Sequence, residues 1–144
     1  MNYVKSIISV LIVVTMISCK SNETEKNPLL NNHWETEIKL DGTNKWTANN
    51  ETTEGVNKML DILENLHTTP ALDYSALGKD LKSEINIVIQ KCSMKGPSHD
   101  NLHVLLMPLI DKGDALQKAR SIEENKALVE SIFYHLKGYE RYFV

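Results

Sequence analysis

Apolar residues recur at three- and four-residue steps in four segments from Glu51 onward, and this period constrains the fold more than any other feature. Such spacing places the apolar side chains of each segment on one face of a helix. Four amphipathic helices joined by short turns bury their stripes together, so the sequence predicts an all-α, up-down-up-down four-helix bundle over residues 51–144. The predicted stripes are Val56, Met59, Leu60, Leu63 and Leu66; Leu77, Leu81, Ile85, Val88 and Cys92; Leu102, Leu106, Leu109, Gly113 and Leu116; and Leu128, Ile132, Leu136, Tyr139 and Phe143.

Local signals predict where these helices begin and end. Pro70 should end the first helix, since the residue before a proline disfavours the helical conformation. In the turn before the third helix, we expect Gly96 to take the left-handed conformation and Ser98 to be the N-cap. The sequence from Ser121 to Glu124 is a capping box for the fourth helix. Gly78 is expected to weaken the start of the second helix.

The N-terminal sequence indicates export. It has one lysine, Lys5, and an apolar run from Ile7 to Ile17, which is too short for a permanent membrane-spanning helix. We therefore expect residues 1–18 to be a cleavable signal peptide. The junction ending in Ser18-Cys19 resembles a bacterial lipobox. That resemblance implies a lipoprotein with acyl chains such as palmitate on Cys19, anchored to a membrane of the cell envelope and facing the periplasm or the surface.

Residues 19–50 should connect this lipidated cysteine to the bundle. Residues 20–33 are rich in Asn, Glu, Lys and Ser and predict a flexible tether. Residues 34–48 contain Trp34, Trp46 and an Asp41-Gly42 turn signal, which predict a short hairpin or an irregular arm lying on the bundle.

Charge and motifs exclude several classes of function. The formal net charge is −3, and acidic and basic residues are interspersed without a basic stripe, so nucleic acid is not an expected partner. The sequence contains no HExxH, no GxSxG and no glycine-rich phosphate loop. It therefore predicts a binding protein and not an enzyme.

The stretch KCSMKGPSHDNLHVLLMP, residues 91–108, collects side chains that soft metals prefer. If Cys19 carries lipid, Cys92 has no internal disulfide partner in an oxidising compartment. His99 and His103 are four residues apart, a spacing that places two imidazoles on one helix face. Thiolate and imidazole suit Cu(I) and Zn(II), with Met94 and Met107 as further soft ligands. The same residue types also fill cores and cap helices, and that alternative stays open.

Two family resemblances bear on function. The order and lengths of the four segments resemble periplasmic cytochromes of the b-type and c-prime class. That resemblance implies, as an alternative function, an electron carrier with haem b as its cofactor and with Met59 and His135 as the residues nearest to the ligand positions. The sequence has no CxxCH motif. Residues 92–103 are similar to a CxMKGxxHxxLH stretch of small, little-characterised bacterial lipoproteins. A third alternative is a ligand-free interaction module whose Trp34–Trp46 arm docks a partner protein of the envelope.

Overall fold

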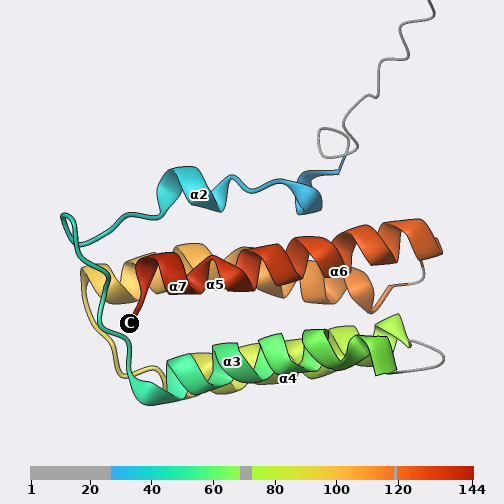
Figure 1. Cartoon of the computed structure of the whole chain (residues 1–144), viewed down its shortest axis with the longest axis horizontal. Coiled ribbons are helices and arrows are strands. Elements are labelled where there is room, and N and C mark those ends of the chain that lie inside the picture. The colour runs from blue at the N-terminus through green and yellow to red at the C-terminus, as the bar shows by residue number, and fades with distance from the viewer. Residues whose placement is uncertain (1–26, 69–72, 119) are drawn as a thin grey trace, which may run out of the picture.

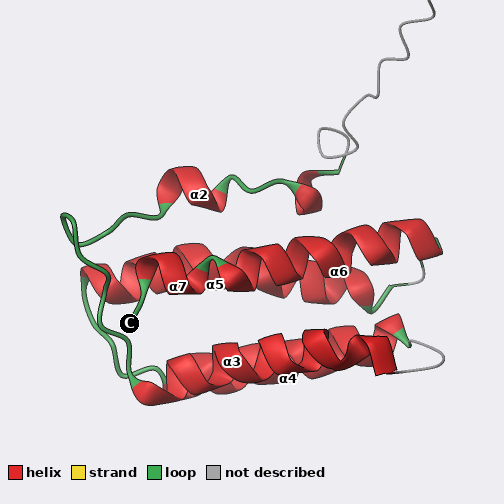
Figure 2. Cartoon of the chain, viewed as in Figure 1, coloured by secondary structure: helices red, strands yellow, loops and turns green. Residues whose placement is uncertain are grey.

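The computed structural model describes residues 27–68, 73–118 and 120–144. Within these ranges the chain is mostly helical and forms no β-strand (Figure 2), so the prediction of an all-α protein is confirmed. The predicted signal peptide, the lipobox and the first part of the tether lie outside the described residues.

Four long helices make up most of the molecule: α3 (Asn50–Glu64), α4 (Tyr74–Lys91), α5 (Pro97–Leu116) and α6 (Ile122–Lys137). Each packs against the next in the chain, and α6 also packs against α3 (Figure 1). Apart from Leu66 and Cys92, which are half-buried, and Gly113, which is buried backbone, all the predicted stripe residues belong to one buried apolar core. The 3.6-residue period was therefore a reliable guide to the core.

One predicted helix start is confirmed and another is wrong, while Pro70, the predicted end of the first helix, lies outside the described residues. At α6, Ser121 Oγ accepts from the backbone N–H of Glu124, and Glu124 accepts in turn from Ser121 N–H, which is the expected capping box. At α5, however, the N-cap is Gly96, with a φ of 63°, and Pro97 occupies the first helical position. The expectation for Ser98 is wrong, because its hydroxyl donates to Lys95 O and so does not cap a backbone N–H group of α5. Proline is well suited to the first turn, where its missing N–H costs nothing.

A shorter arm precedes the four long helices and packs against them. It contains a 3-10 turn, η1 (Pro28–Leu30), and one helical turn, α2 (Trp34–Glu37). Figure 1 shows the arm running along the long helices, and Leu29 and Leu30 pack against the core. The arm therefore begins earlier than the sequence predicts, since residues 28–33 belong to the expected flexible tether.

The second half of the arm is irregular, which was one of the two alternatives predicted for residues 34–48. Gly42, with a φ of 61°, allows a tight turn in which Asp41 and Asn44 exchange backbone hydrogen bonds. Beyond that turn, Trp46 pairs with Tyr142 and Val144 through backbone hydrogen bonds of 2.8 and 2.9 Å. These bonds join the arm to α7 (Tyr139–Tyr142) and the end of the chain.

Helices α4 and α5 approach each other closely through a pair of glycines. A Cβ placed on Gly78 would lie 2.7 Å from the carbonyl oxygen of Gly113 and 2.8 Å from Leu116 Cβ. The role of Gly78 is therefore to let two helix backbones meet, which outweighs its low helix propensity. A salt bridge between Lys82 and Asp114 joins the same two helices beside this contact.

We expect Gly78→Ala to destabilise the fold by about 2 kcal/mol, because the added methyl group forces α4 and α5 apart. On an open helix surface the same change would stabilise by up to about 1 kcal/mol. The measurement is urea unfolding followed by circular dichroism at 222 nm. Ser83→Ala, at an exposed position of α4, is the matched control and should be neutral or slightly stabilising; equal effects from both variants would show that the close contact is unimportant.

Candidate functional site

The corner between α4 and α5 brings two of the predicted ligands together. Cys92 is the C-cap residue of α4, in an extended conformation, and His99 lies in the first turn of α5. Their side chains meet across the turn, with 3.6 Å between Cys92 Sγ and His99 Nδ1. Both residues are half-buried, and Cys92 packs against the apolar core. The corner is held on its other side by Asn49, whose amide donates to Lys91 O at 3.3 Å.

The separation of 3.6 Å is compatible with two kinds of interaction. It suits a hydrogen bond between the thiol and the imidazole nitrogen. It also suits a shared metal ion, because Zn–S and Zn–N bonds of about 2.3 and about 2.0 to 2.1 Å at a tetrahedral angle place the two ligand atoms about 3.5 to 3.6 Å apart. The pair therefore has the spacing of two metal ligands without any movement of the backbone.

The remaining predicted ligands lie progressively farther from this pair. The rings of His99 and His103 are 4.3 Å apart between centroids, and His103 is exposed. Met107, one turn farther along α5, is 54% exposed. Met94 is half-buried and packs against the core from within the turn. In the part of the chain that the structure describes, no three His, Cys, Asp or Glu side chains are grouped closely enough to hold a metal ion.

A second polar cluster, which the sequence did not reveal, lies between α5 and α6. Lys112 of α5 is only 2% exposed, and its ammonium group donates to Ser131 Oγ of α6 at 2.8 Å. It also lies 3.4 Å from Nδ1 of His135, which is fully buried. One signal was present in the sequence: Lys112 follows the buried Leu105 by seven residues and so lies on the same face of α5.

The arm covers this cluster with an aromatic ring. Trp34 stacks on His135 with 4.3 Å between centroids and 7° between planes. A Cβ on Gly138 would overlap the indole, so a glycine is required where Trp34 crosses α6. Arg141 also lies over the Trp34 ring, with its guanidinium carbon 5.4 Å from the centroid, and it donates a hydrogen bond to Glu35 of the arm. Trp34 is therefore fixed by packing on several sides.

Burial shifts the pKa values of both basic groups in the cluster. It lowers the pKa of His135 to about 3, with further lowering by the charges of Lys112 and Arg141 and a smaller opposing effect of the Leu105 carbonyl. It lowers the pKa of Lys112 to about 8. At neutral pH His135 is thus uncharged, and its Nδ1 can accept from the Lys112 ammonium. Nε2 of His135 and Nε1 of Trp34 have no hydrogen-bond partner among the described residues.

The alternative haem ligands are both in the core. Met59 of α3 is 1% exposed, and His135 lies in the cluster just described. The face of the His135 ring is occupied by Trp34 and its Nδ1 by Lys112. The structure therefore gives His135 other neighbours, and haem ligation by this pair stays a prediction.

No protein-family model, curated protein or solved structure matches this chain. Among the described residues, every helix is too short or too polar to cross a bilayer.

We expect the protein to lose stability as the pH falls below about 6.5. The folded pKa of His135 is about 3 and its ordinary value is 6.5, so the unfolded chain binds a proton that the folded chain excludes. The loss should reach about 3 kcal/mol at pH 4.5. Lys112, whose pKa is also lowered, should be protonated throughout this range and so adds no slope.

The measurement compares urea unfolding at pH 7.5 and pH 4.5 in the parent and in His135→Phe, which keeps an aromatic ring against Trp34. The free energy of unfolding should differ less between the two pH values in His135→Phe than in the parent. The control is His33→Ala, at an exposed position of the arm, which should keep the parental difference. A parental difference in His135→Phe would assign the acid sensitivity to other groups.

Proposed function

We propose that this chain is an exported, lipid-anchored protein that binds Cu(I) or Zn(II) through Cys92 and His99. The observation that supports this proposal best is the distance of 3.6 Å between Cys92 Sγ and His99 Nδ1. A thiolate with an imidazole is a donor set that suits both ions, and Cu(I) accepts low coordination numbers with soft ligands. His103, Met94 and Met107 supply further ligands when side chains rotate or when a partner joins the site.

The proposed fold is an up-down-up-down four-helix bundle. The cyclic packing of α3, α4, α5 and α6 supports it, as do the short connections between consecutive helices. In such a bundle the α4–α5 corner lies at one end, where turns and not helix faces surround a bound ion.

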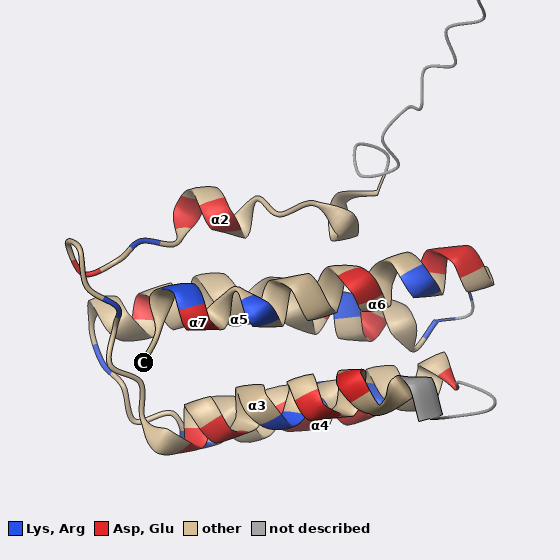
Figure 3. Cartoon of the chain, viewed as in Figure 1, with Lys and Arg blue, Asp and Glu red and all other residues tan. Residues whose placement is uncertain are grey.

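The proposed action is sequestration of the metal or its transfer to another envelope protein, without catalysis. The Cys92–His99 pair is half-buried, while His103 and Met107 are exposed beside it. A partly covered pair retains the ion, and exposed soft ligands provide a route by which a partner's ligands replace them one at a time. The interspersed charges seen along the helices in Figure 3 fit a protein partner better than a nucleic acid.

We expect one Cu(I) to bind per chain, and we expect Cys92→Ser and His99→Ala each to weaken binding at least tenfold. The reason is that each variant removes one of the two ligand atoms already in place. His103→Ala should have a smaller effect, because that side chain is exposed and must move. The measurement is anaerobic titration of a chain beginning at Ser21 against a coloured Cu(I) chelator, repeated with Zn(II).

His33→Ala is the matched control, since it removes an exposed imidazole far along the chain from the corner. Equal affinity of the parent and the Cys92→Ser, His99→Ala double variant would contradict the metal site. The haem alternative would be supported instead by a Soret band that appears when haem is added and is lost in Met59→Leu.

We also propose that Cys19 is the lipid-attachment site, on the basis of the lipobox resemblance. We expect Cys19→Ser to move the protein from the membrane fraction to the soluble fraction and to abolish incorporation of radiolabelled palmitate. Cys92→Ser should change neither, because Cys92 packs against the core. Palmitate incorporation into Cys19→Ser would show that lipid is attached elsewhere.

A further inference from the structure

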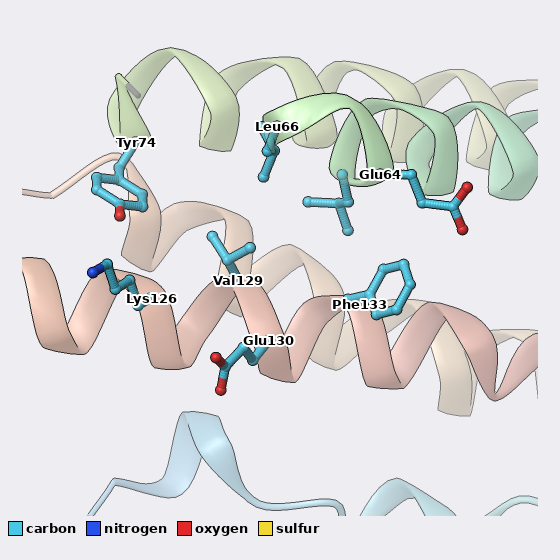
Figure 4. A pocket seen from close by; sticks show the side chains of 8 residues that line it. Glu64, Leu66, Tyr74, Lys126, Val129, Glu130 and Phe133 are labelled. Carbon is cyan, nitrogen blue, oxygen red and sulfur yellow. The ribbon is translucent and has the colours of Figure 1, made fainter. Parts of the chain in front are cut away.

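A large apolar pocket lies at a different place from the metal corner. It has a volume of about 510 Å³ and is formed between the end of α3, the start of α4 and the middle of α6 (Figure 4). Its apolar wall comes from Leu63, Leu66, Val129 and Phe133. Leu63 is buried, and the other three are half-buried and open toward the pocket space. The volume is in the range of small-molecule binding sites.

One end of this pocket carries two hydrogen-bond donors. Figure 4 shows the Tyr74 hydroxyl and the Lys126 ammonium group at the same end, away from Phe133. Within the described residues, neither Tyr74 nor Lys126 makes a hydrogen bond or an ion pair, although Tyr74 is half-buried. Two donors, one of them cationic, are therefore available to a ligand that enters the pocket.

The acidic residues at the rim do not oppose an anion at that end. Glu64 is paired with Lys137 at 3.2 Å, near the opposite end of the pocket. Glu130 points away from the pocket space in Figure 4. The pocket thus has a positive charge at the Tyr74 end and apolar side chains along the middle. At the far end the charge of Glu64 is neutralised by Lys137.

We propose that this pocket binds a free long-chain carboxylic acid. Its carboxylate accepts hydrogen bonds from Tyr74 and Lys126, and its alkyl chain lies along Leu66, Val129 and Phe133. A charge-assisted hydrogen bond at one end fixes the direction of the chain, and burial of methylene groups supplies affinity. The site is separate from Cys92 and His99, and it stands whether or not the corner binds metal.

The test uses a dodecanoic acid that carries a photoactivatable diazirine at the end of its alkyl chain. The full chain is labelled in a sterol-based detergent, which offers no acyl chain of its own, and the labelled residues are mapped by tandem mass spectrometry. Label should appear within residues 63–66 and 129–133. Unlabelled dodecanoate should remove it at concentrations at least tenfold lower than dodecanol does. Label confined to residues 1–26, or equal competition by dodecanol, would overturn the proposal.

Two variants separate the head group from the alkyl chain. Lys126→Met should weaken competition by dodecanoate about tenfold and leave competition by dodecanol unchanged. Its matched control is Lys79→Met, at an exposed lysine of α4, which should behave as the parent does. Val129→Trp should fill the pocket and abolish labelling while the helical circular dichroism is retained. The proposal would be overturned if dodecanoate competed with the probe as well in Lys126→Met as in the parent. It would also be overturned if phosphatidylglycerol displaced the probe and dodecanoate did not.

Discussion

The close packing of α4 on α5 is the constraint on which the rest of the structure depends. At one end the two helices meet backbone to backbone at Gly78 and Gly113. At the other they are joined by a turn of five residues, in which Gly96 takes a conformation that other residues disfavour and Pro97 starts the next helix. With both ends fixed, the helices cannot slide past each other. The positions of Cys92 and His99 follow from this, because each belongs to the last or first turn of a helix whose register is set elsewhere.

The buried cluster beneath Trp34 adds a different kind of constraint. Apolar stripes tolerate small shifts between helices, whereas the hydrogen bond from Lys112 to Ser131 is directional and joins α5 to α6 in one register. Burying a lysine without a carboxylate partner costs stability, as its lowered pKa indicates. The stacking of Trp34 on His135 contributes an aromatic contact of its own, and it fixes the arm against α6.

How much the sequence could predict depended on the kind of interaction. The helices and their buried faces were predictable, since residues such as Val56, Leu106 and Leu128 follow a strict period. The capping box at Ser121 was predictable because it depends only on residues within one turn. The prediction for Ser98 was wrong because Pro97 occupies the first helical position, so α5 begins two residues earlier than a serine N-cap would place it.

The parts that could not be predicted involve residues far apart in the chain. The seven-residue step from Leu105 places Lys112 on a buried face of α5, but nothing local indicates its polar partners, because Ser131 and His135 both come from α6. The meeting of Trp34 with His135 joins residues about a hundred positions apart. The apolar pocket was equally hidden, because Leu66 and Val129 are ordinary members of amphipathic helices until the packing leaves space between them. Of the five predicted metal ligands, Cys92 and His99 are the two that a single turn brings into contact.

The two proposed sites lie toward opposite ends of the long helices. The metal corner is at the start of α5, a helix of 20 residues that spans about 30 Å. The pocket lies beside the end of α3 and the start of α4, which Figure 1 shows at the other end of the long helices. Sites so far apart without shared side chains should respond to substitution independently. The eight residue steps from Cys19 to Asn27 can span at most about 30 Å. A lipid on Cys19 would therefore hold Asn27 within about 30 Å of a bilayer, which is the compartment where long-chain carboxylic acids are most concentrated.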